Sequence, residues 1–168
     1  GVPVVGLEPS CLLTLRDEYK ALLPGEETES LAANAFLFEE FLWQEHESGR
    51  IKLDLKALPT NEALLHGHCH QKALSSVDHS AWLLNLPQNY EVEVIPSGCC
   101  GMAGSFGYEK EHYELSMQIG ELVLFPAIRK AKKEVIIAAP GTSCRHQISD
   151  GTGKVGLHPL EILYKALR

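Results

Sequence analysis

The stretch Ile136-Ile137-Ala138-Ala139-Pro140-Gly141-Thr142-Ser143-Cys144 decides the fold of this 168-residue chain. Its first half belongs to an apolar run, Glu134–Ala139, that is typical of a buried strand, and Pro140-Gly141 then turns the backbone. Thr142 and Ser143 open a helix, so Cys144 falls in the first helical turn. A strand, a turn and a helix in this order form the elementary unit of an α/β protein.

A similar unit stands near the start of the chain. The apolar run Val4–Leu7 is followed by Glu8-Pro9, and Ser10-Cys11 opens the next helix. The partial positive charge of a helix N-terminus favours a thiolate in the first turn of both helices. An apolar strand before a turn also arises by chance, but the shared Ser-Cys indicates a duplication. We therefore expect the tail of a first copy and the whole of a second.

Strands and helices alternate along the remaining sequence. We expect five strands, which are Val2–Leu7, Ala63–Gly67, Tyr90–Ile95, Glu134–Ala139 and Lys154–Leu157. We expect five helices, which are Cys11–Leu23, Thr28–Gly49, Ser75–Leu86, Glu109–Ala131 and Pro159–Leu167. Residues 50–58 remain ambiguous. This alternation predicts an α/β protein with a mainly parallel sheet of about five strands and helices on both faces, in Rossmann-like layers.

Composition narrows the class of protein. A net charge of −7 argues against a nucleic-acid or anionic-membrane surface, and an apolar content of 45% fits a globular domain. No apolar run approaches the ~20 residues of a membrane span. The start lacks an initiator Met and the features of a signal peptide, so we expect a fragment of a larger protein that forms one compact domain. Five cysteines, an odd number, favour a reducing, cytoplasmic setting.

Adjacent cysteines in Gly98-Cys99-Cys100-Gly101 are the most informative chemical feature. Neighbouring thiols pair only through a strained ring, whereas flanking glycines let both sulfurs turn toward one target. Cys69 and Cys144 also follow expected strands. Because the carboxyl ends of parallel strands lie along one edge, these four thiols can converge. Each cysteine alone is more often a small buried hydrophobe, but together they suit one [4Fe–4S] cluster or one zinc ion.

Glycines follow the cysteine pair at Gly101, Gly104 and Gly107. They allow backbone N–H groups to approach an anionic cluster closely and to tune its potential through contacts with sulfur. A phosphate-binding loop is the competing interpretation, but this spacing matches neither the dinucleotide fingerprint nor the nucleotide-triphosphate loop.

Several cationic or titratable side chains accompany the cysteines. His66, His68 and His70 surround Cys69, where they can bind a metal, carry protons or donate to sulfur, or merely line one face of a strand end. Arg145 follows Cys144, and a cation there lowers a thiol pKa, although a solvated helix surface explains it equally well. His158, which precedes Pro159 at another strand end, is either a site residue or a helix cap, and we favour the cap.

These motifs resemble the cysteine-rich CCG domain of heterodisulfide reductases, of the iron–sulfur subunits of glycolate and glycerol-3-phosphate dehydrogenases, and of FAD-linked oxidases. The resemblance covers nearly all of the chain and is specific around the cysteines. The strongest likeness is to the C-terminal iron–sulfur region of FAD-linked oxidases that act on D-2-hydroxy acids. The segments that carry it are Glu8–Cys11, His66–Lys72, Ser97–Gly107 and Gly141–Cys144.

The resemblance implies a site and a division of the chain. Residues 1–27 would be the tail of a degenerate first CCG repeat, and residues 28–168 the second repeat. Cluster ligands would be Cys69, Cys99, Cys100 and Cys144, with Cys11 as a further candidate from the first repeat. Gly101, Gly104, His68, His70 and Arg145 would surround the cofactor.

One departure from the family pattern bears on the cofactor. Gly141 stands where the family has the first cysteine of a terminal Cys-x-x-Cys, and Glu8 stands there in the first copy. Non-cubane clusters of heterodisulfide reductase use five cysteines per copy. Four remain here, which favours an ordinary [4Fe–4S] cluster.

The resemblance also implies a function. FAD in another domain would oxidise a 2-hydroxy acid, ferredoxin-like clusters would relay the electrons, and this domain would pass them to a quinone or protein acceptor. The isolated fragment would have no turnover, and it would be cytoplasmic or held at the inner membrane face by partners. The rivals are a structural zinc domain, a thiol–disulfide redox module and a pure interaction module.

Overall fold

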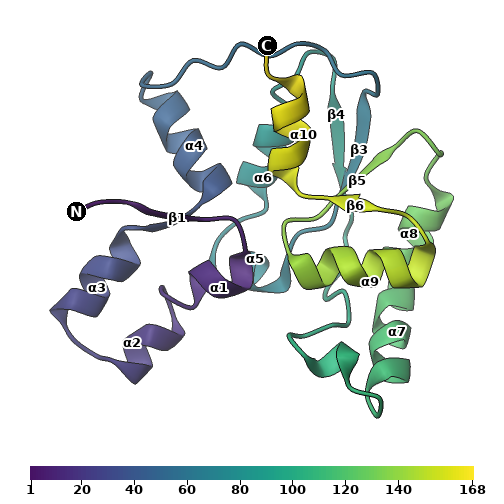
Figure 1. Cartoon of the computed structure of the whole chain (residues 1–168), viewed down its shortest axis with the longest axis horizontal. Coiled ribbons are helices and arrows are strands. Elements are labelled where there is room, and N and C mark those ends of the chain that lie inside the picture. Colours follow the sequence, from purple (N-terminus) through teal and green to yellow (C-terminus); the bar gives the residue numbers. More distant parts are fainter.

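The computed structural model describes residues 1–168 as an α/β fold with two parallel sheets (Figure 1). The larger sheet has four strands in the order β4-β3-β5-β6, and every neighbouring pair is parallel. The smaller sheet pairs β1 with β2. The predicted α/β class with a mainly parallel sheet and helices on both faces is confirmed.

The strands are short. They are β1 (Val4–Gly6), β2 (Ala35–Leu37), β3 (Glu62–Leu65), β4 (Glu91–Val94), β5 (Ile136–Ala138) and β6 (Gly156–Leu157). The helices between them are α1 (Pro9–Leu13), α2 (Glu18–Leu22), α3 (Glu26–Ala33), α4 (Phe38–Glu47), α5 (Cys69–Leu74), α6 (Asp78–Leu84), the 3₁₀ turn η1 (Phe106–Tyr108), α7 (Tyr113–Leu122), α8 (Leu124–Lys130), α9 (Thr142–Thr152) and α10 (Pro159–Ala166).

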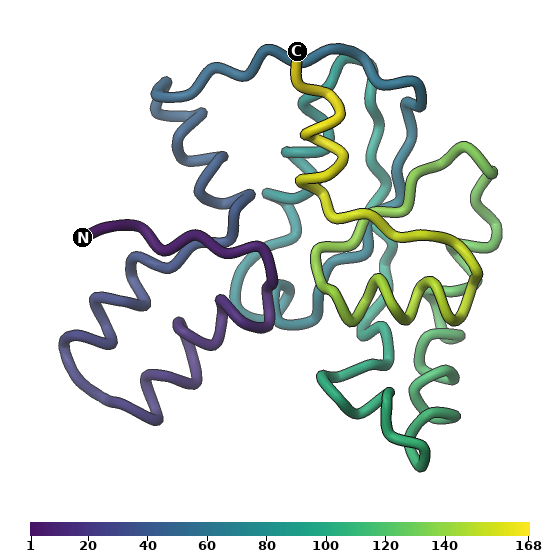
Figure 2. The backbone as a smooth tube through the Cα atoms, viewed as in Figure 1, coloured from purple at the N-terminus to yellow at the C-terminus, as the bar shows by residue number.

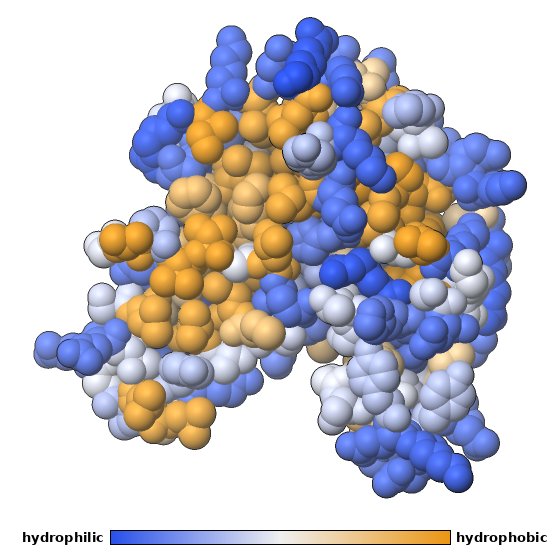
Figure 3. Space-filling view, in the orientation of Figure 1, coloured by the Kyte–Doolittle hydropathy of each residue, from blue (hydrophilic) through white to orange (hydrophobic).

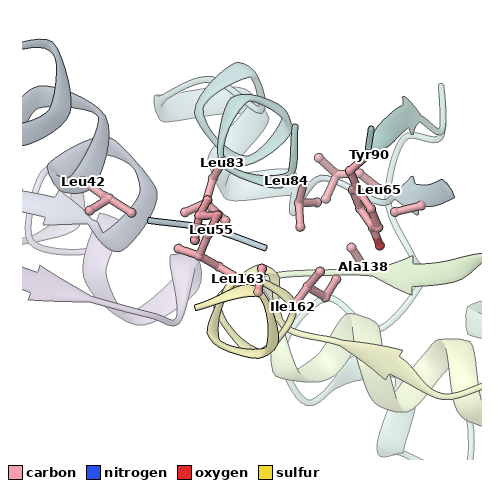
Figure 4. Packing of buried hydrophobic residues seen from close by; sticks show 11 residues of the cluster. Leu42, Leu55, Leu65, Leu83, Leu84, Tyr90, Ala138, Ile162 and Leu163 are labelled. Carbon is pink, nitrogen blue, oxygen red and sulfur yellow. The ribbon is translucent and has the colours of Figure 1, made fainter. Parts of the chain in front are cut away.

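Successive side chains of the central strands point to opposite faces of the sheet and pack into two separate cores. On one face, Leu65 of β3 and Ala138 of β5 pack with α6 and α10 (Figure 4). On the other face, Leu64 and Ile137 pack with Phe125 of α8 and with α9. Two buried faces are what a parallel sheet requires, and they hold β3 and β5 rigidly beneath their carboxyl-terminal loops.

The N-terminal third departs from the expected helices. The helix predicted over Thr28–Gly49 is interrupted by β2, because Ala35–Leu37 pairs with β1 instead of continuing the helix. A run of three apolar residues fits both the helical and the strand period, so the pairing with β1 determines that this segment is a strand. The tube in Figure 2 shows this purple-to-blue part set to the left of the main sheet.

Three other expected helices also differ. The helix predicted over Glu109–Ala131 is divided at Val123, and Pro126 lies in the first turn of α8, where its missing N–H costs no helical hydrogen bond. The helix predicted over Cys11–Leu23 is divided into α1 and α2. The helix predicted over Ser75–Leu86 is shorter, and a separate helix, α5, starts at Cys69.

The ambiguous residues 50–58 form no helix, and Leu55 makes an isolated bridge with Leu167. None of the helices has both the length and the apolar character needed to span a membrane.

Candidate metal centre

Four of the cysteines follow three neighbouring strands and lie at one edge of the sheet. β3 is followed by His66 and by Cys69 at the start of α5. β4 leads into the loop that carries Cys99 and Cys100, and β5 leads into α9, which carries Cys144. Because β4, β3 and β5 are adjacent and parallel, their carboxyl-terminal loops are neighbours.

The four thiols form a continuous series of contacts. Cys69 lies close enough to Cys99, Cys99 to its neighbour Cys100, and Cys100 to Cys144 for each thiol to shift the pKa of the next. Cys100 and Cys144 are buried, Cys99 is half-buried and Cys69 is exposed, and none is in a disulfide. The site therefore runs from the core to the surface.

His66 adds a nitrogen to the buried end of this series. A ring nitrogen of His66 and the Sγ atoms of Cys100 and Cys144 all lie within 4.8 Å of one another. Nδ1 of His66 lies 2.7 Å from Oγ of Ser97, which leaves Nε2 fully buried without a hydrogen-bond partner. A buried imidazole nitrogen beside two thiols is a donor set that fits a soft metal ion or an iron–sulfur cluster.

Backbone N–H groups surround the sulfurs. The N–H of Gly101 donates to Sγ of Cys99 over 3.2 Å, and the N–H of Ala103 also donates to Cys99. Met102 and His70 donate in the same way to Cys100 and Cys69. Such contacts stabilise negative charge on sulfur.

Gly101 is required for this loop. Its φ is +104°, and a Cβ there would lie 2.1 Å from the backbone oxygen of Ser116. Only glycine combines this backbone conformation with so close an approach. Gln147 of α9 donates to the backbone and the hydroxyl of the same Ser116, so the loop is fixed against both α7 and α9.

Electrostatics divide the thiols into two kinds. Hydrogen bonds from Cys100 and Cys69 hold the pKa of Cys99 far below its usual range, and the hydrogen bond from Cys100, with help from His66, lowers the pKa of Cys144 to about 5. Conversely, the hydrogen bond with Cys144 raises the pKa of Cys100, and the bond with Cys99 raises that of Cys69.

Lys72 was not anticipated from the sequence as part of the site. Its Nζ donates to the carbonyl oxygens of Ser97 and Gly98 over 2.5 and 2.7 Å, and so holds the loop that leads into Cys99. Burial lowers the pKa of Lys72, while the nearby cysteines oppose that shift. Its position one helical turn after Cys69 was the only signal in the sequence.

His68 and Gly141 pack together at the buried side of the site. His68 is the N-cap of α5, where its Nδ1 accepts from the N–H of His70. A Cβ on Gly141 would lie 2.4 Å from Cδ2 of His68 and 3.2 Å from Sγ of Cys144. The imidazole of His68 therefore fills the space beside Gly141. Burial lowers the pKa of His68.

Glu8 joins the first copy to this site. Its Oε2 accepts from the N–H of Thr142 at the start of α9 over 2.7 Å, and its Oε1 accepts from Ser10. Burial alone would raise the pKa of Glu8, but these hydrogen bonds lower it overall. The carboxylate thus occupies the helix end that carries Cys144.

The other candidate residues lie farther out. His70 is partly exposed, 3.9 Å from Glu18, and Gly104 has a φ of +70° in open space. Arg145 donates to the backbone oxygens of Ala139 and Pro140, so it braces the β5–α9 turn. Cys11 is exposed on α1, outside the group of His66, Cys100 and Cys144.

The interpretation of His158 as a cap is confirmed. Its Nδ1 accepts from the N–H of Leu160, and its own N–H donates to Glu161 at the start of α10.

Comparisons with known proteins point to dehydrogenases. The chain is 32% identical over 167 residues to a subunit of the anaerobic glycerol-3-phosphate dehydrogenase of Escherichia coli K12, covering 99% of the chain and 41% of that protein. It is 31% identical over 170 residues to D-2-hydroxyglutarate dehydrogenase of the same strain, covering 100% of the chain and 16% of that protein.

A D-2-hydroxyglutarate dehydrogenase of Haemophilus influenzae is 28% identical over 175 residues, and 16% of its length is covered. The chain spans less than half the length of these curated relatives. No protein-family model matches the chain, and no solved structure matches it significantly.

Proposed function

We propose that this chain is the iron–sulfur electron-transfer region of a longer FAD-linked dehydrogenase. The observation that carries the proposal is the series of four neighbouring thiols, closed at its buried end by the imidazole of His66. Similarity to dehydrogenases along the whole chain supports a redox role over a purely structural one.

Cys69, Cys99, Cys100 and Cys144 would hold the cofactor, a [4Fe–4S] cluster. Such a cluster supplies one-electron transfer over a wide range of potentials. The protein would contribute the N–H donors of the Cys99–Ala103 loop and the ammonium of Lys72, which offset negative charge on the thiolates. Binding would require the cysteine ligands as thiolates and would therefore release protons.

Electrons would enter from a flavin domain that oxidises a 2-hydroxy acid, pass through ferredoxin-like clusters, and leave toward a quinone or a protein acceptor. The name of the D-2-hydroxyglutarate dehydrogenases supports the substrate class. Cys69 is the exposed residue among the four proposed ligands, so electrons would cross the surface on its side of the site. We further propose that the chain holds the tail of a first repeat, followed by a second repeat, and that the protein is cytoplasmic.

Anaerobic reconstitution with iron and sulfide tests this function. We expect about four irons per chain and an electron paramagnetic resonance signal after reduction. Cys99→Ser should lose both, because it removes the thiolate that contacts both Cys69 and Cys100.

Cys11→Ser is the matched control, since Cys11 is exposed outside the buried group. It should keep the iron content of the unmodified chain. One tightly bound zinc and no uptake of iron would contradict the proposal and leave a metal-stabilised structural domain.

A further inference from the structure

The chain contains the same βαβα unit twice. In one copy β1 leads into α1, and β2 leads into α4; in the other copy β5 leads into α9, and β6 leads into α10. Both strand pairs are parallel. Cys11 and Cys144 both lie in the first turn of the helix that follows the first strand.

Capping contacts fix how the two copies align. The N–H of Leu37 donates to Glu40 over 2.8 Å, and the N–H of His158 donates to Glu161 over the same 2.8 Å. In each copy the glutamate lies three residues after the N-cap, which is the capping-box arrangement. Aligning Leu37 with His158 matches β1 residue by residue with β5, because the strand pairings have the same register.

This register matches Val4 with Ile137 and Val5 with Ala138. Val4 pairs with Ala35, two residues before Leu37, and Ile137 pairs with Gly156, two residues before His158. The alignment from the cysteines agrees, since Val4 lies seven residues before Cys11 and Ile137 seven before Cys144.

The two copies differ on one side of the first strand. β5 lies between β6 and β3, whereas β1 pairs with β2 alone. Val4 and Val5 are 39% and 40% exposed, while their counterparts Ile137 and Ala138 are 2% and 0% exposed. The first copy lacks a strand in the position of β3, and it also lacks the residues that cover Ile137 and Ala138 on the two faces of the main sheet.

Backbone N–H and C=O groups at this edge of β1 also lack a partner strand. The N–H of Val4 donates to Asn34 on the β2 side over 2.8 Å. Successive residues of a strand direct their N–H groups to opposite sides, so the N–H and C=O of Val5 face the bare edge. A strand that pairs here would take up both groups.

The first copy is too small to be complete by itself. Its core has four buried residues, which are Leu12, Leu13, Ala35 and Leu37. Apolar side chains at the end of α2 stay exposed, with Leu22 at 71% and Leu23 at 63%. Figure 3 shows hydrophobic surface over the β1 region at the left of the view. An isolated parallel pair of strands is rare, because parallel sheets are normally buried on both faces.

We propose that the bare edge of β1 binds a parallel β-strand of a further α/β half, supplied by a part of the whole protein outside these 168 residues. Its residue opposite Val5 would be apolar, as Leu65 is opposite Ala138. The curated relatives are long enough to carry such a half, since the chain covers only 41% and 16% of two of them.

Hydrogen–deuterium exchange of the Val5 amide tests the strand. It should be measured in the 168-residue chain alone and in the whole protein as its source cell makes it. We expect rapid exchange in the chain alone and protection at least about a hundredfold greater in the whole protein. Equal exchange rates of the Val5 amide in the two proteins would overturn the proposal, whether that exchange is rapid or slow. Protection of the chain alone that vanishes on dilution would overturn it in favour of a second copy.

Val5→Pro tests the same edge by another route. Proline removes the N–H that faces the bare edge but spares those of Val4 and Gly6, which face β2. The substitution should lower the unfolding midpoint of the whole protein and change that of the chain alone much less, and Val2→Pro, at an exposed position outside β1, is the control. Equal effects in both proteins would contradict the proposal. Neither readout depends on metal content, so failure here is separable from failure of iron uptake.

Discussion

The ammonium of Lys72 donates to the carbonyl oxygen of Gly98 over 2.7 Å, across 26 positions of the sequence. It also donates to Ser97, and it forms no ion pair with a carboxylate. The side chain therefore ties α5, which begins at Cys69, to the loop that carries the cysteine pair.

Lys72→Met should loosen this loop and weaken the metal-free fold. Hydrogen bonds from a charged group contribute about 1.5–3 kcal/mol each, so we expect a loss of about 2 kcal/mol in the free energy of unfolding by urea. Lys132→Met is the control, because Lys132 is 73% exposed and its pairing with Glu62 should contribute little. Equal losses of unfolding free energy in the two variants would contradict the role of Lys72 in holding this loop.

Alanine substitutions of three glycines should be graded by backbone conformation and space. Gly98 has open space and no positive φ, so Gly98→Ala should change stability little. Gly104→Ala should cost about 1 kcal/mol, because its φ of +70° is left-handed but its surroundings are open. Gly101→Ala should cost more than either, because the added Cβ also meets backbone. Urea unfolding of the metal-free variants measures the order, and a mild Gly101→Ala would contradict the loop geometry.

Glu40 should make stability depend on acid pH. Burial alone would raise its pKa, but hydrogen bonds from Arg16, Ser75 and the N–H of Leu37 lower it overall. A lowered pKa gives a stabilisation that is complete above the unfolded value of about 4.3 and is lost as the pH falls through the folded value.

Glu40→Gln should therefore be less stable at neutral pH by about 3 kcal/mol, since it leaves the partly buried Arg16 unpaired. Its stability should also decline less steeply between pH 5 and acid than that of the unmodified chain. Glu47→Gln, at an exposed carboxylate, should leave the profile unchanged. If the unfolding free energy of Glu40→Gln and that of the unmodified chain fell equally steeply with decreasing pH, the described titration of Glu40 would be contradicted.

Tyr90 should act at the opposite end of the pH range. Burial raises its pKa to about 12, and the side chain is only 5% exposed within the core of Figure 4. Because the unfolded tyrosine ionises first, near pH 10, stability should fall as the pH rises above that value. Tyr90→Phe should abolish this part of the decline in thermal unfolding, and Tyr164→Phe, at a 73% exposed position, should not. An unchanged slope in Tyr90→Phe would contradict the buried phenol.

The sequence was sufficient to predict that Cys69, Cys99 and Cys144 follow parallel strands. Buried strands are recognisable in a sequence as short apolar runs, and the carboxyl ends of parallel strands lie along one edge of the sheet. It was not sufficient to predict β2. Ala35–Leu37 is too short to show a period, and its conformation depends on pairing with β1. The break near Val123 comes shortly before Pro126, whereas no local signal in the sequence marks the break after Leu13.

Two contributors to the site could not be identified from local pattern. Lys72 contacts a loop 25 and 26 residues away, and Glu8 reaches Thr142 across 134 positions. Such contacts depend on the three-dimensional arrangement of the strands. His66 was visible as a candidate beside Cys69, but only its geometry with Cys100 and Cys144 separates it from His68 and His70.

The Mössbauer spectrum of the chain reconstituted anaerobically with ⁵⁷Fe and sulfide tests the central claim most directly. If Cys69, Cys99, Cys100 and Cys144 hold one [4Fe–4S] cluster, the iron should appear as delocalised mixed-valence pairs, with about four irons per chain. That signal should disappear in Cys144→Ser and persist in Cys11→Ser. Mononuclear ferrous iron alone, or a chain that excludes iron and retains one zinc, would contradict the account.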